Sequence, residues 1–387
     1  MNNNFLYFLL LKFFLFPIAV AILLPNQKLL AQYNLQNLSL IDTEEITDFR
    51  YKNLQLFPVI ANEAFLEKHK NIGNYTVLQE ALINKQVKIT EQSYSENANN
   101  HTEYASISPT LAAESSQEIA EQKLQSTNNN LLSIYDNNVL HQQILEQVQQ
   151  KSIIDIDLIN ELLITNISKD TLYLMAGEVI RGGKQDRVVA NDMLILPKAE
   201  KVALPVFCVE KGRWNYKKDA MQPFNEYFHV SSMQIRQAIQ QSDNQELIWK
   251  VIEKINRKNE VVSKTQAYTE LAQSSVFRKQ FIDYFSFFKD IFKEKKNVIG
   301  LVVVSGNEIL GCDLFATSHL FEQKYNSLLH SYCTEAITNG DVPSVERKKV
   351  MAYLTEFLGD EQSQELIVKY KGSVFEHQEQ KLHITTF

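Results

Sequence analysis

The chain has 387 residues, of which 44% are hydrophobic and 22% are charged. This composition is typical of a folded globular protein and excludes a chain that is disordered or membrane-embedded as a whole. The formal net charge of −7 argues against nucleic acid or an anionic membrane as a partner, although it leaves room for a local basic pocket. We therefore predict no nucleic-acid partner. The length allows one large domain or two small ones.

The N-terminus has the pattern of a targeting segment. An apolar run from Phe13 to Leu24 follows Lys12 and is shorter than the roughly 20 apolar residues that a membrane span needs. We therefore predict a signal peptide over residues 1–31, cleaved after Ala31, and export to the periplasm or the medium. An uncleaved anchor is the alternative for this segment. No later segment is apolar enough to cross a membrane, so no membrane span is expected after signal removal.

The rest of the chain divides by composition into three parts. Residues 32–94 form the N-terminal part of the domain, with a predicted strand from Leu54 to Ile60 that Pro58 would place at a sheet edge. Residues 95–150 are rich in Asn, Gln and Ser, which predicts a disordered insertion. The main part of the same domain follows at residues 151–387.

The spacing of hydrophobic residues predicts an α+β fold. Residues from about 153 to 214 form β-rich stretches broken by polar or glycine signals, and helical spacing follows from about 231 to 358. A buried strand from Val298 to Val304 turns into a second strand, Glu308–Phe315, and the end from Glu365 returns to strands. We therefore expect an antiparallel β-rich half packed with helices, with further strands at both ends.

Three cysteines, Cys208, Cys312 and Cys333, match no zinc-binding spacing. In an oxidising compartment the best candidate disulfide is Cys312–Cys333, and the alternative is that all three are small buried hydrophobic side chains. The sequence has no histidine pair with metal-ligand spacing, no glycine-rich phosphate loop and no G-x-S-x-G elbow. We therefore predict no metal site and no cofactor.

One polar constellation carries most of the chemistry, and its first segment is a predicted hairpin. Gly182 and Gly183 suit a two-residue turn because both positions tolerate positive φ. In this register Glu178 faces Arg187, and Gln185 projects from the same side of the ribbon.

The second segment ends a predicted strand with Glu210, followed by Arg213 and Trp214. Two arginines can bind a carboxylate or phosphate through planar forks, and a tryptophan can stack on a ring. This pattern predicts a binding site for a small anionic molecule. The alternative is an ion-pair ladder, in which each cross-strand pair contributes only ~0.2–1 kcal/mol. The predicted site consists of Glu178, Gln185, Arg187, Glu210, Arg213 and Trp214.

Five motifs together give the chain a family resemblance: AGEVIRGGKQDRVV, VFCVEKGRW, SMQIRQAI, QELIWKVI and GNEILGCDLFA. From Leu54 to Phe387, apart from the polar insertion, the chain resembles the ARPP-1 domain family. These are bacterial proteins whose name records an association with ADP-ribosyl glycohydrolase and rhodanese/phosphatase-type domains. The resemblance implies a role related to nucleotide or ADP-ribose metabolism. The matching positions are Gly177, Glu178, Gly183, Gln185, Arg187, Cys208, Glu210, Gly212, Arg213 and Trp214.

These observations leave two functions open. The first is an exported protein that binds or processes a small anionic ligand, related to nucleotides or ADP-ribose, at the predicted site. The second is a structural or interaction protein of the cell envelope without catalytic activity. Solvent exposure separates them, because an open concave cluster favours the first and a filled, internally paired cluster favours the second. The sequence decides neither whether the protein is an enzyme nor its oligomeric state.

Overall fold

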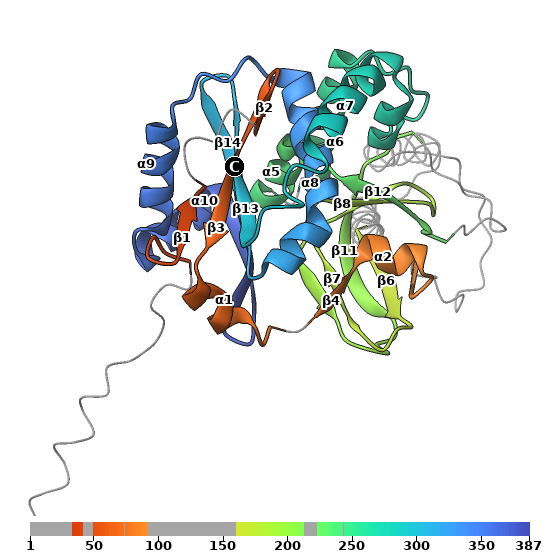
Figure 1. Cartoon of the computed structure of the whole chain (residues 1–387). Coiled ribbons are helices and arrows are strands. Elements are labelled where there is room, and N and C mark those ends of the chain that lie inside the picture. The colour runs from red at the N-terminus through yellow and green to blue at the C-terminus, as the bar shows by residue number, and fades with distance from the viewer. Residues whose placement is uncertain (1–32, 42–48, 73, 92–159, 213–222, 243) are drawn as a thin grey trace, which may run out of the picture.

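The computed structural model describes residues 33–41, 49–72, 74–91, 160–212, 223–242 and 244–387. The predicted signal peptide and the predicted insertion lie outside these ranges, as do Arg213 and Trp214. The described part forms two lobes on either side of a long helix, α8 (Ser318–Asn339) (Figure 1). Helices and antiparallel sheets occur together, which confirms the predicted α+β class.

The first lobe is a seven-stranded antiparallel sheet with helices on both faces. Its strands are β1 (Leu38–Leu40), β2 (Arg50–Tyr51), β3 (Leu54–Ala61), β13 (Val298–Ser305), β14 (Glu308–Phe315), β15 (Gly372–His377) and β16 (Gln380–Thr386). Its helices are α1 (Glu63–His69), α7 (Ser275–Phe288), α9 (Arg347–Leu358) and α10 (Glu361–Lys371). The order is β1-β3-β13-β14-β16-β15, with β2 paired to β3.

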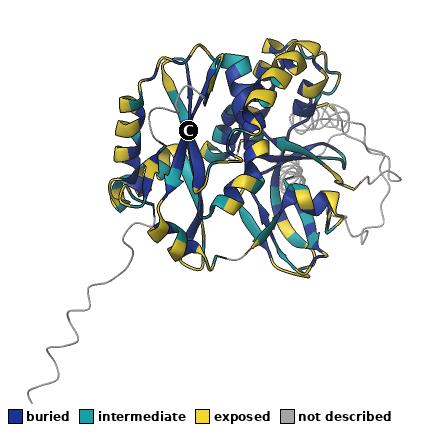
Figure 2. Cartoon of the chain, viewed as in Figure 1, coloured by how far each residue is buried: buried dark blue, intermediate teal, exposed yellow. Residues whose placement is uncertain are grey.

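The middle strand β13 is buried along its whole length because both faces of this sheet are covered. Leu301 and Val303 pack into the core that contains residues of α7 and α8. Val302 and Val304 point the other way and pack into the core that contains residues of α9. This alternation follows from the two-residue period of a strand. Figure 2 shows the result, with buried strands between helices whose outer faces are exposed.

Two strand predictions in this sheet have different outcomes. The hairpin is confirmed, since Ser305 pairs with Glu308 across a two-residue turn. The prediction that the first strand lies at an edge is wrong, because β3 pairs with β13 on one side and with β1 and β2 on the other. Pro58 is tolerated because it lies between the stretches that pair with β2 and with β1. The predicted C-terminal strands begin only after α10, at Gly372.

The second lobe contains two sheets that share one core. Its strands are β4 (Tyr75–Val77), β5 (Val87–Glu91), β6 (Glu161–Asn166), β7 (Thr171–Leu174), β8 (Glu178–Arg181), β9 (Arg187–Val189), β10 (Met193–Ile195), β11 (Val202–Cys208) and β12 (Glu226–Val230). Its helices are α2 (Leu78–Ile83), α5 (Met233–Gln241), α6 (Gln245–Lys258) and the 3-10 helix η2 (Tyr268–Gln273). The sheet orders are β12-β8-β9-β11-β6-β5 and β10-β7-β4.

Each face of the six-stranded sheet has its own core. Ile180 and Val189 pack with Leu172 of the three-stranded sheet, whereas Val179 and Val188 pack with residues of α5 and α6. The second lobe is inserted in the sequence of the first, because the strands β4 to β12 lie between β3 and β13. The seven-stranded sheet therefore joins distant parts of the chain, as in the pair Phe57–Val302.

Helix α8 is buried over most of its length between the two lobes. Its buried residues include apolar side chains such as Leu328 together with Lys324, His330 and Glu335. A helix with buried residues on all sides belongs inside a protein, and its polar side chains then need partners from the surrounding elements. These polar residues of α8 contribute to the clusters described below.

The three cysteines are buried free thiols, so the candidate disulfide between Cys312 and Cys333 is not formed. Burial raises the pKa of Cys208, Cys312 and Cys333, which keeps the thiols protonated. Both observations support the alternative that the cysteines are small hydrophobic side chains.

Candidate functional site

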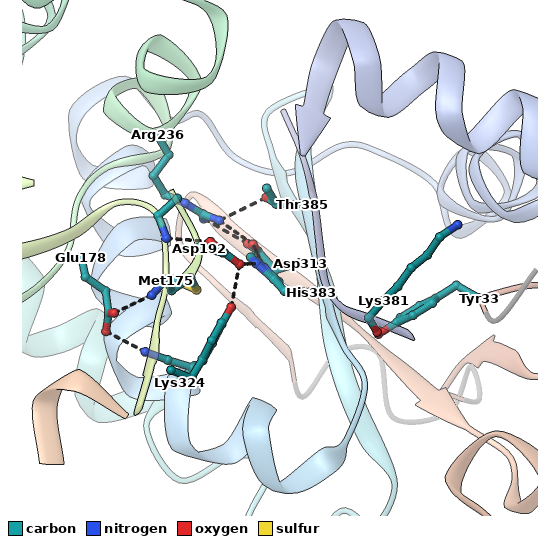
Figure 3. Close-up of polar contacts among 12 residues, drawn as sticks. Tyr33, Met175, Glu178, Asp192, Arg236, Asp313, Lys324, Lys381, His383 and Thr385 are labelled. Carbon is teal, nitrogen blue, oxygen red and sulfur yellow. Dashed lines mark hydrogen bonds and ion pairs between the residues drawn. The ribbon is translucent and has the colours of Figure 1, made fainter. Parts of the chain in front are cut away.

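Glu178 of β8 is fully buried and has partners on three sides. Its Oε2 accepts a hydrogen bond from the Met175 amide at 2.7 Å, and its Oε1 accepts one from the Tyr227 hydroxyl at 2.9 Å. The same Oε1 lies 2.7 Å from Nζ of Lys324 on α8 (Figure 3). The predicted pair with Arg187 is therefore replaced by a pair with the central helix.

Arg187 of β9 has no exposed surface. Its Nη1 donates to the Gln185 carbonyl oxygen at 2.8 Å, and its Nη2 lies 3.6 Å from Oε1 of Glu91. Nε and Nη2 have no hydrogen-bond acceptor among the described residues. The sequence missed Glu91 because the predicted insertion separates it from the motif. An anionic ligand could reach this guanidinium only if the surrounding chain moved.

Gln185 and Glu210 lie together and are each 3% exposed. The side-chain amide of Gln185 donates to the Glu210 carbonyl oxygen at 2.6 Å, and Oε2 of Glu210 accepts from the Asp186 amide at 3.2 Å. Asp186 in turn accepts from the Gly182 amide and from the Thr269 hydroxyl, at 3.2 and 2.6 Å. The loop before Arg187 is thereby held to the segment that follows β11 and to η2.

These bonds explain why the predicted hairpin register is wrong. Arg187 pairs with Ile180 rather than with Glu178, and five residues (182–186) instead of two connect β8 and β9. Gly182 and Gly183 do have positive φ, at 137° and 52°, but the loop residues bond to Asp186, Glu91 and Glu210 rather than across the ribbon. The shift is by two residues, so Arg187 keeps its predicted face.

The six predicted residues therefore do not form one described site. Gln185, Arg187 and Glu210 lie in one buried cluster, and Glu178 has a separate set of partners. Arg213 and Trp214 lie outside the described residues.

A second buried cluster joins the two lobes around His383 of β16 (Figure 3). Its Nδ1 lies 2.7 Å from Oδ2 of Asp192 in the second lobe, and its Nε2 lies 3.1 Å from Oδ1 of Asp313 on β14. Asp313 also binds Arg236 of α5, with Nη1 to Oδ2 at 3.1 Å, and accepts from the Tyr332 hydroxyl at 2.6 Å. We call this set the His383 network.

Charges in the His383 network balance when the imidazole is protonated. Burial by itself lowers the pKa of His383, but the adjacent carboxylates of Asp192 and Asp313 raise it overall. Burial raises the pKa of Asp313, but Arg236 and His383 outweigh it and hold that pKa well below its usual range. Because both ring nitrogens are bonded and the ring is 2% exposed, His383 has no position left for a substrate.

A cavity of about 420 Å³ lies where α5, the β13–β14 turn and the C-terminal part of α8 meet. Hydrogen-bonding side chains are prominent in its lining: Gln234, Gln237, Ser305, Glu335, Asn339 and Asp341. None of the described lysines or arginines lines it. We call it the Glu335 cavity.

Glu335 is the unusual member of this lining. It is 6% exposed, and its Oε1 accepts from the amides of Gln234 and Asn339, at 3.2 and 2.7 Å. Its Oε2 has no hydrogen-bond partner among the described residues. Burial raises the pKa of Glu335 despite these two bonds. Sequence reasoning did not assign the cavity, although Gln234 and Gln237 lie in one of the motifs that carry the family resemblance.

The sequence matches a family over residues 141–382, described as the ARG and Rhodanese-Phosphatase-superfamily-associated Protein domain, ARPP-1. The chain therefore belongs to the ARPP-1 family. No curated protein and no solved structure matches it. Within the described ranges, no helix is long and apolar enough to span a bilayer, and no group of three metal-ligating side chains is placed to hold an ion.

Proposed function

We propose that the protein is an exported binding module that takes a small polar ligand in the Glu335 cavity. The observation that carries this proposal is Glu335 itself, a buried carboxylate at a cavity of ligand size whose Oε2 has no hydrogen-bond partner among the described residues. Buried polar groups normally have partners, and a rotation of the Glu335 side chain toward the cavity would let Oε2 accept a hydrogen bond from a ligand. The apolar run before Ala31 supports the export part of the proposal.

The lining favours a ligand with hydrogen-bond donors over an anion. Glu308, Glu335 and Asp341 are the charged lining residues, so a nucleotide or ADP-ribose would meet like charge there. The Arg187 cluster suits such an anion chemically, but its described members are buried and paired with one another. A polyol, a sugar or an amine is therefore the better class of ligand.

A thermal-shift screen tests the binding proposal. Sugars, polyols, amines and amino acids form one arm, and nucleotides and ADP-ribose form the other. A ligand at 100 times its Kd should add about 2.7 kcal/mol of stability. Gln234→Ala and Glu335→Gln should abolish the shift, whereas Arg187→Lys should leave it intact. A shift that survives both cavity variants would contradict this site, and a nucleotide shift lost only in Arg187→Lys would restore the site predicted from sequence.

A separate measurement tests export. Protein purified from its own host should begin at Gln32 and appear outside the cytoplasm, as shown by mass spectrometry of the N-terminal peptide. An intact Met1 in the cytosolic fraction would contradict export and would leave the binding proposal standing.

The alternative is a structural or interaction protein of the cell envelope. The specific observation in its favour is that Glu178, Gln185, Arg187 and Glu210 are filled in and internally bonded, as a stabilising cluster would be. Failure of every ligand in the screen would favour this alternative.

A further inference from the structure

Three turns at one end of the second lobe each expose an aliphatic side chain. Ile83 ends α2 and is 71% exposed, Ile167 lies between β6 and β7 and is 50% exposed, and Leu196 follows β10 and is 59% exposed. These elements belong to the lobe in which α2, β6 and β7 are labelled in Figure 1. Single exposed aliphatic residues are ordinary, but these three lie on turns that hydrogen bonds join to one another.

Asn166 joins these turns rigidly. It is 1% exposed, and its side-chain amide donates to the carbonyl oxygens of Asp170 and Leu196, at 2.8 and 3.0 Å. The neighbouring Ile167 amide donates to the Gln86 carbonyl oxygen at 2.8 Å, which adds the turn after α2. The three aliphatic residues are therefore presented by a fixed frame.

The same end is basic in an acidic protein. Its acidic residues are the half-buried Asp170, the exposed Glu200 and the exposed Glu80 one turn before Ile83, whereas the chain as a whole carries −7. The exposed lysines of these turns and of the start of β5 are Lys85, Lys88, Lys169, Lys198 and Lys201. Five lysines against three acids make this surface locally positive.

The backbone holds three of these lysines in an unfavourable conformation. Lys85, Lys198 and Lys201 have φ values of 53°, 61° and 50°, in the left-handed region that side chains with a Cβ rarely adopt. Such strain persists only where surrounding contacts fix the backbone, and it is often found at functional surfaces. Here the surrounding contacts fix the turns that carry both the lysine and the aliphatic side chains.

We propose that this three-turn end docks on the surface of an anionic lipid bilayer. Ile83, Ile167 and Leu196 would enter the boundary between headgroups and acyl chains, and the lysines would contact lipid phosphates. A bilayer fits better than a protein partner for two reasons. The apolar residues sit on separate turns rather than in a groove, and the charged residues beside them are mostly exposed lysines, which protein interfaces disfavour. The proposal does not depend on the Glu335 cavity.

Co-sedimentation of the purified protein with vesicles tests the proposal. Vesicles of phosphatidylcholine containing about one third phosphatidylglycerol should bind the protein in low salt, and pure phosphatidylcholine vesicles should not. Binding should fall at least tenfold at 0.5 M salt, because surface charges are then screened. The charge variant Lys85→Glu/Lys169→Glu/Lys201→Glu and the apolar variant Ile83→Ser/Ile167→Ser/Leu196→Ser should each lose at least tenfold in affinity.

The matched controls change equally exposed residues elsewhere. Val262→Ser/Ile282→Ser/Leu366→Ser removes three aliphatic side chains that are 99%, 54% and 58% exposed, and should bind as the unmodified protein does. Equal binding to both vesicle types, or equal loss in control and test variants, would overturn the proposal. So would a protein partner captured at this end without any vesicle binding. If a test variant fails to fold, the lipid and salt dependence of the unmodified protein decides.

Discussion

Two buried carboxylates, Asp313 and Glu335, show what separates a structural charge from a candidate binding group. Asp313 is 1% exposed, and both of its oxygens are engaged by Arg236, with Tyr332 and His383 as further partners. Glu335 is 6% exposed, yet only one of its oxygens has hydrogen-bond partners among the described residues. The pKa shifts run in opposite directions, lowered for Asp313 and raised for Glu335. Substitution of Asp313 should therefore lower the stability of the fold, whereas substitution of Glu335 should weaken ligand binding.

The largest effect is expected from Asp313→Asn. Removing this charge leaves Arg236 buried without its counter-ion, and breaking a buried pair in this way typically costs about 3–5 kcal/mol. Urea unfolding should show a loss of that size. Asp283→Asn is the control, because Asp283 pairs with Lys52 at the surface and should change stability by less than about 1 kcal/mol. Equal losses in both variants would contradict the comparison.

Arg187→Lys should have the next largest effect. An ammonium group cannot reproduce the hydrogen bond to Gln185 while it stays beside Glu91, so we expect a loss of about 1–3 kcal/mol. Ligand binding in the Glu335 cavity should not change. Arg181→Lys, at a half-exposed arginine on β8, is the control for urea unfolding. Unchanged stability in Arg187→Lys would mean that the cluster is not structural.

His383 should make stability depend on pH. Its pKa is raised in the folded protein, so the folded state holds this proton more tightly than the unfolded state does. The contribution is complete below the unfolded pKa of about 6.5 and is lost as pH rises through the folded pKa. The lowered pKa values of Asp192 and Asp313 act at the acid end, where their contribution is lost as pH falls.

Comparison of the unmodified protein with His383→Gln between about pH 5 and pH 9 measures this effect. The stability difference between the two proteins should shrink as pH rises. Burial lowers the pKa of His229 to about 4 and also lowers that of His330, which acts in the opposite direction. Both residues are present in both proteins, so their effects cancel in the difference. A difference that is constant with pH would mean that folding does not shift the pKa of His383, and a difference that grows as pH rises would mean that the folded protein holds His383 neutral.

The smallest effect on folding is expected from Glu335→Gln. Burial already disfavours the charged carboxylate, so a neutral amide should change the unfolding free energy by no more than about 1 kcal/mol. The same change should abolish the ligand-induced thermal shift. Gln364→Glu, at a buried glutamine on α10 away from the cavity lining, is the control that should leave the shift intact. A large loss of stability in Glu335→Gln would place Glu335 with Asp313 as a structural charge.

Local patterns in the sequence predicted the fold class and several of its elements. Two such patterns are the alternation in β13 and β14 and the helical spacing after Ser231. Both depend only on neighbours along the chain, so they could be predicted from the sequence alone. The strand register around Gly182 and Gly183 could not be predicted from the sequence, because the loop bonds to Glu91 and Glu210 from other segments.

The polar clusters were the least predictable part. His383 and Asp192 meet only because two lobes pack together, and each is an isolated polar residue in its own stretch of sequence. One usable signal was overlooked: Arg236 lies between apolar positions of a predicted helix, and Asp313 lies in an apolar strand. Charges in such places must find each other in the interior.

The pairing of Phe57 with Val302 has a consequence for the order in which the protein can be assembled. After β3 has emerged from the ribosome, the whole second lobe must still be synthesised before β13 emerges, and β16 is the last strand to appear. The second lobe can begin to collapse early, but the seven-stranded sheet cannot close until synthesis is nearly complete. The exposed edges of the unfinished sheet are then the segments most in need of a chaperone.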